Sequence, residues 1–156
     1  MVNSNYQAEV GKPSKTARAF ISNAPISVKY SVELCNQIKT RPVSKVIEFL
    51  KRIIAHEEYL PLRRYNKKVA HRKGSAKEGV KSGRYPEKVA VEFIKLLELA
   101  KTNADFKGLD SEKLLIIHAF ANMGMNRFSY QSKGKIAGKA RRRNATNIEV
   151  IVQEMK

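Results

Sequence analysis

The chain has 156 residues, with 31 Lys and Arg against 14 Asp and Glu and a formal net charge of +17. This length fits one domain, residues 1–156, with a sizeable core. So large a positive excess makes a free globule repel itself, and nucleic acid is the acidic partner that would best compensate it. A membrane partner is disfavoured, because the charge gathers in Gly-containing loops and no stretch approaches the ~18 apolar residues of a span. Residues 1–15 lack the apolar core of a signal peptide, so a cytosolic protein is expected.

The first part of the chain predicts a polar lead-in and a strand. Residues 1–15 are expected to form a flexible basic N-terminus, in which Lys12 and Lys15 are candidate RNA-binding residues. Residues 16–22 predict a strand, because Ala and Ile alternate with larger or polar side chains. Pro25 ends this strand.

Two helices are predicted next. Ser27 is placed as the N-cap of a helix over 28–39, in which the lone Cys35 is expected to be a buried thiol. Pro42 suits the first turn of a second helix that continues to about Glu58. The short link between the two helices predicts that they fold as antiparallel neighbours.

Residues 60–84 lose helical periodicity and predict a basic loop. A third helix begins at Pro86 and ends before Gly108, with apolar residues at three- and four-residue spacing. The candidate RNA-binding residues of the loop are Arg63, Arg64, Asn66, Lys67, Lys68, His71, Arg72, Lys73 and Arg84.

The last part of the chain predicts a long basic hairpin. Residues 113–120 and 148–152 are rich in β-branched or aromatic residues, and with the strand near residue 20 they predict a small three-stranded antiparallel sheet on which the three helices pack. The fold class is therefore α+β. The hairpin spans 113–152 with its tip near 128–143, and arms of about 20 residues would reach roughly 60 Å. No Asp or Glu lies between Lys113 and Ile148, and the candidate RNA-binding residues of the hairpin are Arg127, Lys133, Lys135, Lys139, Arg141, Arg142 and Arg143.

Enzyme chemistry is disfavoured by the residue types and their spacing. His56, His71 and His118 are far apart in the sequence, and no metal-ligand spacing accompanies them. His56 is expected at the surface or at a helix end, and His118 in packing or an RNA contact. The sequence has no Walker loop, dinucleotide motif or paired cysteines, so no catalytic residue, metal or cofactor is expected and an RNA-modifying enzyme is disfavoured.

The two basic clusters are interpreted as RNA-binding rather than as solvated faces, because acidic residues are nearly absent from both. Aromatic and amide side chains that can stack on bases or bond to sugars are interleaved with them, although Tyr85 and Phe128 border regular elements and could belong to the core. Gly134 and Gly138 favour a broad, irregular tip. The stacking and bonding candidates are Tyr65, Asn66, Tyr85, Phe128, Tyr130 and Gln131.

Several short strings occur in a specific order and spacing along nearly the whole chain. They are Ile26 to Glu33, Asn66 to Val69 with His71 and Arg72, Gly83 to Pro86, Asn103 and Ala104, Lys107 to Asp110, and Asn147 to Val150. In their order and spacing, these strings resemble a large-subunit ribosomal protein family called L twenty-two in bacteria and L seventeen e in eukaryotes, most closely its archaeal branch. The family's hairpin commonly carries Arg-Ala-x-Gly-Arg-Ala, and the corresponding stretch here is Lys135 to Ala140, with lysine at both arginine positions.

The resemblance implies a structural ribosomal protein that binds large-subunit ribosomal RNA beside neighbouring ribosomal proteins. It also implies that the hairpin lines the nascent-peptide exit tunnel, with the nascent polypeptide near its tip. The alternative is a DNA-architectural protein whose basic β-arm enters a groove, for which Ile136 is the available apolar wedge at the tip.

Overall fold

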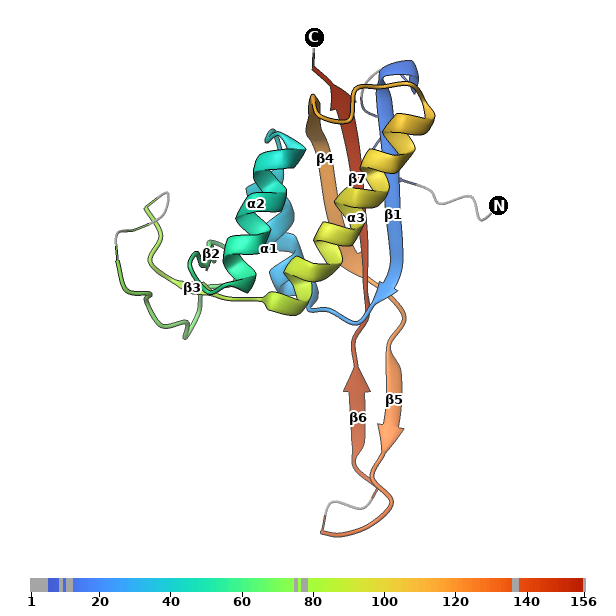
Figure 1. Cartoon of the computed structure of the whole chain (residues 1–156). Coiled ribbons are helices and arrows are strands. Elements are labelled where there is room, and N and C mark those ends of the chain that lie inside the picture. Colours follow the sequence, from blue (N-terminus) through green and yellow to red (C-terminus); the bar gives the residue numbers. More distant parts are fainter. Residues whose placement is uncertain are drawn as a thin grey trace.

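A three-stranded antiparallel sheet forms the centre of the molecule (Figure 1). The computed structural model describes residues 6–8, 10, 13–74, 76, 79–135 and 138–155. The strands are β1 (Thr16–Ala24), β4 (Leu114–Met123) and β7 (Thr146–Glu154), in the order β1-β7-β4. The last strand in the chain thus lies between the other two. The predicted α+β class and three-stranded sheet are confirmed.

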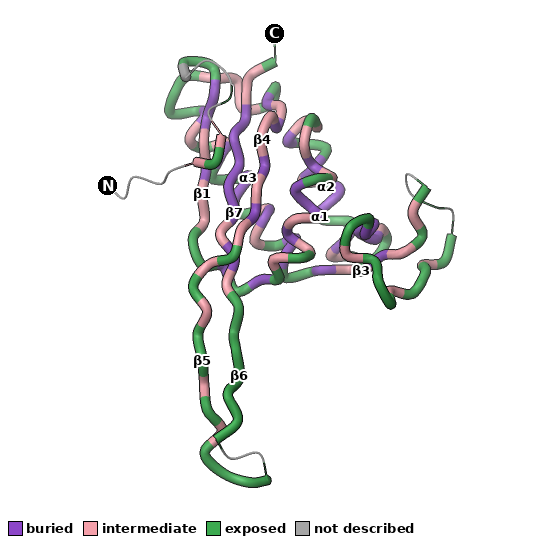
Figure 2. Tube along the Cα trace, turned by 180° about the vertical axis from the view of Figure 1, so that it is seen from behind, coloured by how far each residue is buried: buried purple, intermediate pink, exposed green. Residues whose placement is uncertain are grey.

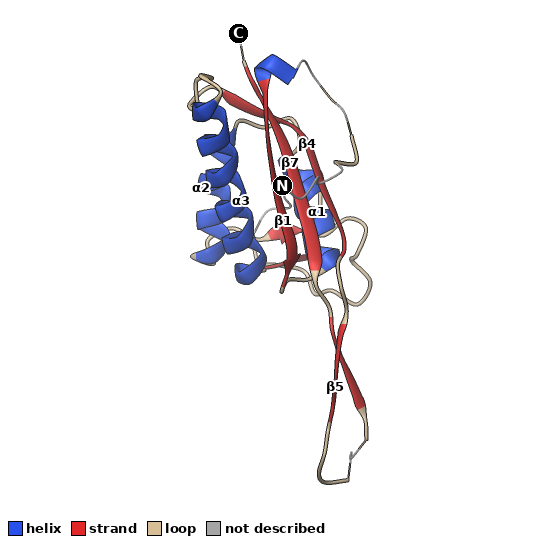
Figure 3. Cartoon of the chain, turned by 90° about the vertical axis from the view of Figure 1, so that its right-hand side faces the viewer, coloured by secondary structure: helices blue, strands red, loops and turns tan. Residues whose placement is uncertain are grey.

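Three helices pack on this sheet. They are α1 (Val28–Ile38), α2 (Val43–Ile54) and α3 (Glu87–Phe106). The longest, α3, contacts β1, β7 and α2, and Figure 3 shows α2 and α3 together on one side of the sheet. α1 packs along β4, the edge strand farthest from β1.

The prediction that α1 and α2 are antiparallel neighbours is wrong, since α1 packs mainly on β4 and α2 on α3. The link between them explains the difference. Thr40 has a left-handed φ of 61°, its amide donates to the Ile116 carbonyl over 2.8 Å, and Pro42 forms a β-bridge with Leu115. The link is therefore held at the edge of β4, which separates the helices.

The predicted helix ends also differ from the observed ones. α2 stops at Ile54, four residues before Glu58, because His56 adopts a left-handed φ of 61° that a helix cannot continue through. The amides of Glu57 and Glu58 instead donate back to the Arg52 carbonyl. Pro42 is the N-cap of α2 rather than its first residue, and Ser27 is the N-cap of α1 but makes no side-chain capping bond.

The core forms where one face of the sheet meets the helices. Ala17 and Ile116 both lie opposite Val152, so their side chains share one face of adjacent strands. Phe93 of α3 is fully buried in the same cluster. Cys35 is also buried, and this burial raises the pKa of its thiol to about 12. The predicted role of Cys35 as a buried thiol is confirmed.

The opposite face of the sheet holds a buried acid. Glu149 and His118 belong to the neighbouring strands β7 and β4, and the His118 Nε2 lies 2.9 Å from Glu149 Oε1. The Gln7 amide donates to the same oxygen over 3.0 Å, and Tyr6 packs edge-on against Phe20. Part of the predicted N-terminal lead-in therefore contacts the sheet, and His118 is a packing residue.

Both edges of the sheet are engaged by other parts of the chain. Along β1, Asn103 donates to the Arg18 carbonyl and Lys107 to the Thr16 carbonyl, each over 2.8 Å. Along β4, the link around Thr40 supplies the bonds described above. These contacts fix α3 and the α1–α2 link relative to the sheet.

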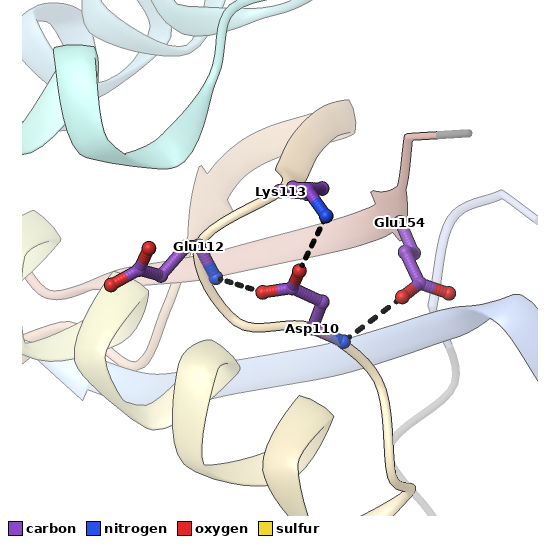
Figure 4. Close-up of polar contacts among 4 residues, drawn as sticks. All are labelled: Asp110, Glu112, Lys113 and Glu154. Atoms are coloured by element: carbon purple, nitrogen blue, oxygen red, sulfur yellow. Dashed lines mark hydrogen bonds and ion pairs between the residues drawn. The ribbon is translucent and has the colours of Figure 1, made fainter.

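A compact turn joins α3 to β4 at the end of the sheet away from the hairpin (Figures 1 and 4). The Asp110 carboxylate accepts from the Glu112 amide and lies 3.0 Å from Lys113 Nζ. The hydrogen bond from Lys113 lowers the pKa of Asp110 below its ordinary 3.8. The Asp110 amide in turn donates to Glu154, which ties the end of β7 to this turn.

The hairpin leaves the opposite end of the sheet as a narrow arm, residues 124–145, and Figure 2 shows the described part of this arm as mostly exposed. Its strands are β5 (Arg127–Tyr130) and β6 (Ala140–Arg143). The two halves of the predicted hairpin do pair, but the expectation that its full reach of roughly 60 Å protrudes from the core is wrong, because Leu114–Met123 and Thr146–Glu154 are strands of the central sheet. Each leg has about 11 residues, so the arm reaches at most about 36 Å.

Candidate nucleic-acid interface

The basic loop, residues 62–82, is held at its base by a buried carboxylate of α1. The Glu33 side chain accepts from the amides of Arg64 and Tyr65, each over 2.7 Å, and from that of Arg63 over 3.3 Å. Glu33 is only 3% exposed, so these charge-assisted bonds form away from water. The backbone of these three consecutive loop residues is thereby fixed against the domain, while the side chains of Arg63 and Arg64 are exposed.

A short ribbon closes the loop. β2 (Leu60–Pro61) pairs with β3 (Gly83–Arg84), and His71 forms a further bridge with Ser82. Gly83 is needed here because a Cβ would lie 2.2 Å from the Tyr59 ring. The ribbon brings the two ends of the basic loop together.

Two aromatic rings of the loop region are already engaged within the chain. Arg64 and Lys29 lie over the Tyr65 ring at 5.6 and 5.8 Å. Tyr85 stacks on His56 at 4.8 Å, and Arg72 lies 5.3 Å from its centroid. His56 also lies 2.6 Å from Glu87 and so has the surface role predicted for it. Both rings therefore serve to position basic side chains.

Most of the predicted loop residues present charge or polar groups to solvent. Arg72 and Arg84 are half-buried, and each guanidinium donates to the Gly83 carbonyl, so these two also stabilise the ribbon. The exposed members are Arg63, Arg64, Asn66, Lys67, Lys68, His71 and Lys73.

A polar recess of about 250 Å³ lies between α1 and the start of the loop. Lys39 and Arg41, which follow α1 in the link to α2, line it together with Arg63 and Arg64. Four cations thus surround one recess whose acid, Glu33, is bonded to backbone amides. The sequence reasoning missed Lys39, Arg41 and Lys29, because their nearness to the loop arises from long-range packing.

The arm has two chemically different faces. Directly opposite residues of an antiparallel pair share a face, and successive residues alternate. Arg127 lies opposite Arg143, and Ser129 lies opposite Arg141. One face, the arginine face, therefore carries Arg127, Arg141 and Arg143.

The arginine face is unfavourable for a free protein. Like charges directly opposite one another destabilise a strand pair. No ion pair between described residues involves a side chain of the arm, so nothing in that part of the chain offsets the repulsion. A polyanion lying along this face would convert the repulsion into attraction.

The root of the arm is held by asparagines. The Asn23 Oδ1 accepts from the Met125 amide, and the Asn147 Oδ1 accepts from the Asn23 amide, each over 2.8 Å. Gly124 lies between them, where a Cβ would be 2.5 Å from Asn23 Oδ1. The direction in which the arm leaves the sheet is therefore set by contacts of the domain.

The structure does not bring all predicted residues into one site. Figure 1 shows the loop projecting sideways and the arm downward, so they form two separate basic projections. Lys15 ends a 3-10 helix (Pro13–Lys15) at the start of β1, away from the arm root. Lys12 and Ile136 lie outside the described residues. The exposed basic residues of the arm are Arg127, Lys133, Lys135, Lys139, Arg141, Arg142 and Arg143.

Among the residues that the structure describes, no group of three or more His, Cys, Asp or Glu side chains could hold a metal ion. None of the helices described is long and apolar enough to cross a membrane.

The fold and the charge distribution define a class: a basic α+β domain with a pinned basic loop and a protruding β-arm. Comparison of the sequence with known families narrows this class to one family. The family model described as "Ribosomal protein L22p/L17e" matches residues 19–153, and the chain belongs to this family. The predicted membership, including the archaeal branch, is confirmed.

Curated relatives support the assignment over nearly the full length. A protein of Ignicoccus hospitalis is 41% identical over 97% of both chains. One of Methanococcus vannielii is 38% identical over 99% of both, and one of Methanopyrus kandleri is 41% identical over 90% of this chain and 87% of its own. Each of these relatives is named "Large ribosomal subunit protein uL22".

Proposed function

We propose that this protein is a structural constituent of the large ribosomal subunit that binds large-subunit ribosomal RNA through its basic loop and its arm. The arginine face of the arm is the observation that carries this proposal. Its opposed arginines are destabilising in isolation, and closely spaced phosphates would stabilise them. The full-length relatives are named as proteins of the large ribosomal subunit, which supports ribosomal RNA as the source of those phosphates.

The two projections would have different roles. The loop is held by Glu33 and by its ribbon, and it surrounds the recess lined by Lys39 and Arg41, so it suits a phosphate cluster close to the domain. The arm reaches away from the domain and would enter a gap between RNA helices. Its far end would line the peptide exit tunnel, near the nascent polypeptide, while other parts of the surface contact neighbouring ribosomal proteins.

Sedimentation tests membership in the subunit. Tagged protein is expected to comigrate with the large subunit on sucrose gradients at both low and high salt. Migration at the top of the gradient, or with DNA, would contradict the proposal and favour a DNA-architectural role.

Binding to isolated large-subunit RNA tests the mechanism. Each neutralised phosphate contributes about −0.7 to −0.9 to the slope of log K against log salt. Arg127→Gln, Arg141→Gln and Arg143→Gln in one protein should therefore make the slope shallower by roughly 2 to 3. An affinity that does not change with salt in the unmodified protein would exclude phosphate neutralisation.

A further inference from the structure

The second face of the arm is aromatic. Phe128 lies opposite Arg142, and Tyr130 lies opposite Ala140, so these four side chains share the face opposite the arginine face. Phe128 is 60% exposed and Tyr130 is 72% exposed. Two large rings two residues apart on one strand thus face solvent without covering.

These rings differ from the other aromatic candidates in the basic regions. Tyr65 and Tyr85 are occupied by cations and by His56, as described above. The Arg142 guanidinium, across from Phe128, lies 3.3 Å from the Met123 sulfur, so it is directed toward the arm root. The ring faces of Phe128 and Tyr130 therefore remain available to a ligand.

The charge around the rings identifies the ligand. A bare aromatic pair suits a nucleobase or an apolar protein surface. The other face of the arm carries three arginines, Arg142 borders the rings, and no acidic residue lies between Lys113 and Ile148. The arm therefore attracts a polyanion. When the polyanion is a nucleic acid, the part that stacks on a ring is an unpaired base.

We propose that Phe128 and Tyr130 form a stacking site for unpaired nucleobases, so that the arm holds phosphates on one face and splayed bases on the other. This assignment rests on the proposed function and deepens it, because it specifies the kind of RNA segment that the arm recognises. The arm would thus select looped or single-stranded segments over a continuous duplex, whose bases are stacked within the helix.

The test uses the full chain and two RNA probes. One is a stem-loop with 2-aminopurine in its unpaired loop, and the other is the same strand fully paired with its complement. Base stacking on a protein ring is worth a factor of roughly 5 to 150 in affinity per base. Phe128→Leu and Tyr130→Leu should each weaken stem-loop binding by a factor in this range. They should also reduce the quenching of 2-aminopurine, and they should leave duplex affinity and the salt slope unchanged.

Phe106→Leu is the matched control, because Phe106 is 89% exposed but lies at the end of α3, outside both basic projections. It should change neither affinity nor quenching. Equal losses for stem-loop and duplex in the ring variants, or no loss for either, would overturn the stacking site. Unchanged RNA binding combined with lost crosslinks to a nascent chain would assign the face to peptide instead.

These outcomes separate the two proposals. If the unmodified protein binds the stem-loop with a steep salt dependence and the ring variants bind equally well, the stacking site fails and the phosphate mechanism stands. If the unmodified protein shows no salt-dependent RNA binding, the proposed function itself fails.

Discussion

Replacing Glu33 by Gln would test whether the buried carboxylate sets the geometry of the basic loop. Gln preserves the shape of the side chain and can retain neutral bonds to the amides of Arg64 and Tyr65. A hydrogen bond to a charged group contributes about 1.5 to 3 kcal/mol and a neutral one about 0.5 to 1.5, so each 2.7 Å bond weakens by about 1 kcal/mol. The Gln NH2 would also face the Arg63 amide, which loses its acceptor at 3.3 Å.

The total loss for Glu33→Gln is about 2 to 3 kcal/mol, which for a domain of this size lowers Tm by about 4 to 12 °C. Thermal unfolding followed by circular dichroism measures this change. Hydrogen exchange locates it, because the amides of Arg64 and Tyr65 should exchange faster. Glu48→Gln is the matched control on the exposed face of α2, where the same substitution should change stability by less than about 0.5 kcal/mol.

RNA affinity gives a second readout in which two effects have opposite signs. Glu33→Gln removes a negative charge, which by electrostatics alone would strengthen RNA binding. Release of the loop would weaken binding, because its residues would have to be ordered on the RNA at a cost of about 1 to 2 kcal/mol each. We expect weaker binding. Tighter binding, together with unfolding and exchange like those of Glu48→Gln, would refute the anchoring role of Glu33.

Four further expectations concern the root of the arm, the Cys35 thiol, the Asp110 carboxylate and the arm itself. Gly124→Ala should lower Tm, because the new Cβ would lie 2.5 Å from Asn23 Oδ1, and an unchanged Tm would show that the arm root is not rigid. The Cys35 thiol, with a pKa of about 12, should react with an aromatic disulfide reagent at pH 8 only after denaturation, and fast reaction of the native protein would contradict its burial. Lys113 lowers the pKa of Asp110, so the stabilising contribution of that carboxylate is present above pH 3.8 and is lost as pH falls through the lowered pKa of the folded state. An NMR titration of the Asp110 carboxyl that shows no lowered pKa would contradict this ion pair. Deletion of residues 128–143 removes no core residue and should leave a cooperative unfolding transition, whereas its loss would show that the arm is part of the folding unit.

Local patterns in the sequence predicted much of the fold. Helical spacing of apolar residues located all three helices, since burial of one helix side requires that spacing. The β-branched runs located β4 and β7, and the absence of acids located the arm. The same local pattern could not show where the sheet ends and the arm begins, because a strand sequence is similar whether its backbone pairs within a sheet or in a free ribbon.

The parts that were not predicted depend on contacts between distant residues. Glu33 anchors amides about 30 positions away, and nothing in the pattern of α1 marks that role. The separation of α1 from α2 depends on Thr40 pairing with β4, which the short link did not reveal. Similarly, only the register of β5 with β6 shows that Phe128 and Tyr130 share a face opposite the arginines.

The contacts at the edges of the central sheet have a consequence for the free protein. An open strand edge can recruit a strand from another chain and start aggregation. Here Asn103 and Lys107 bond to two carbonyls of β1, and the link around Thr40 bonds to β4 at Ile116, so fewer backbone groups of these edges can pair with a second copy. The strands of the arm carry Arg127, Arg141, Arg142 and Arg143, whose positive charge repels another copy. Both features disfavour self-association of the free protein.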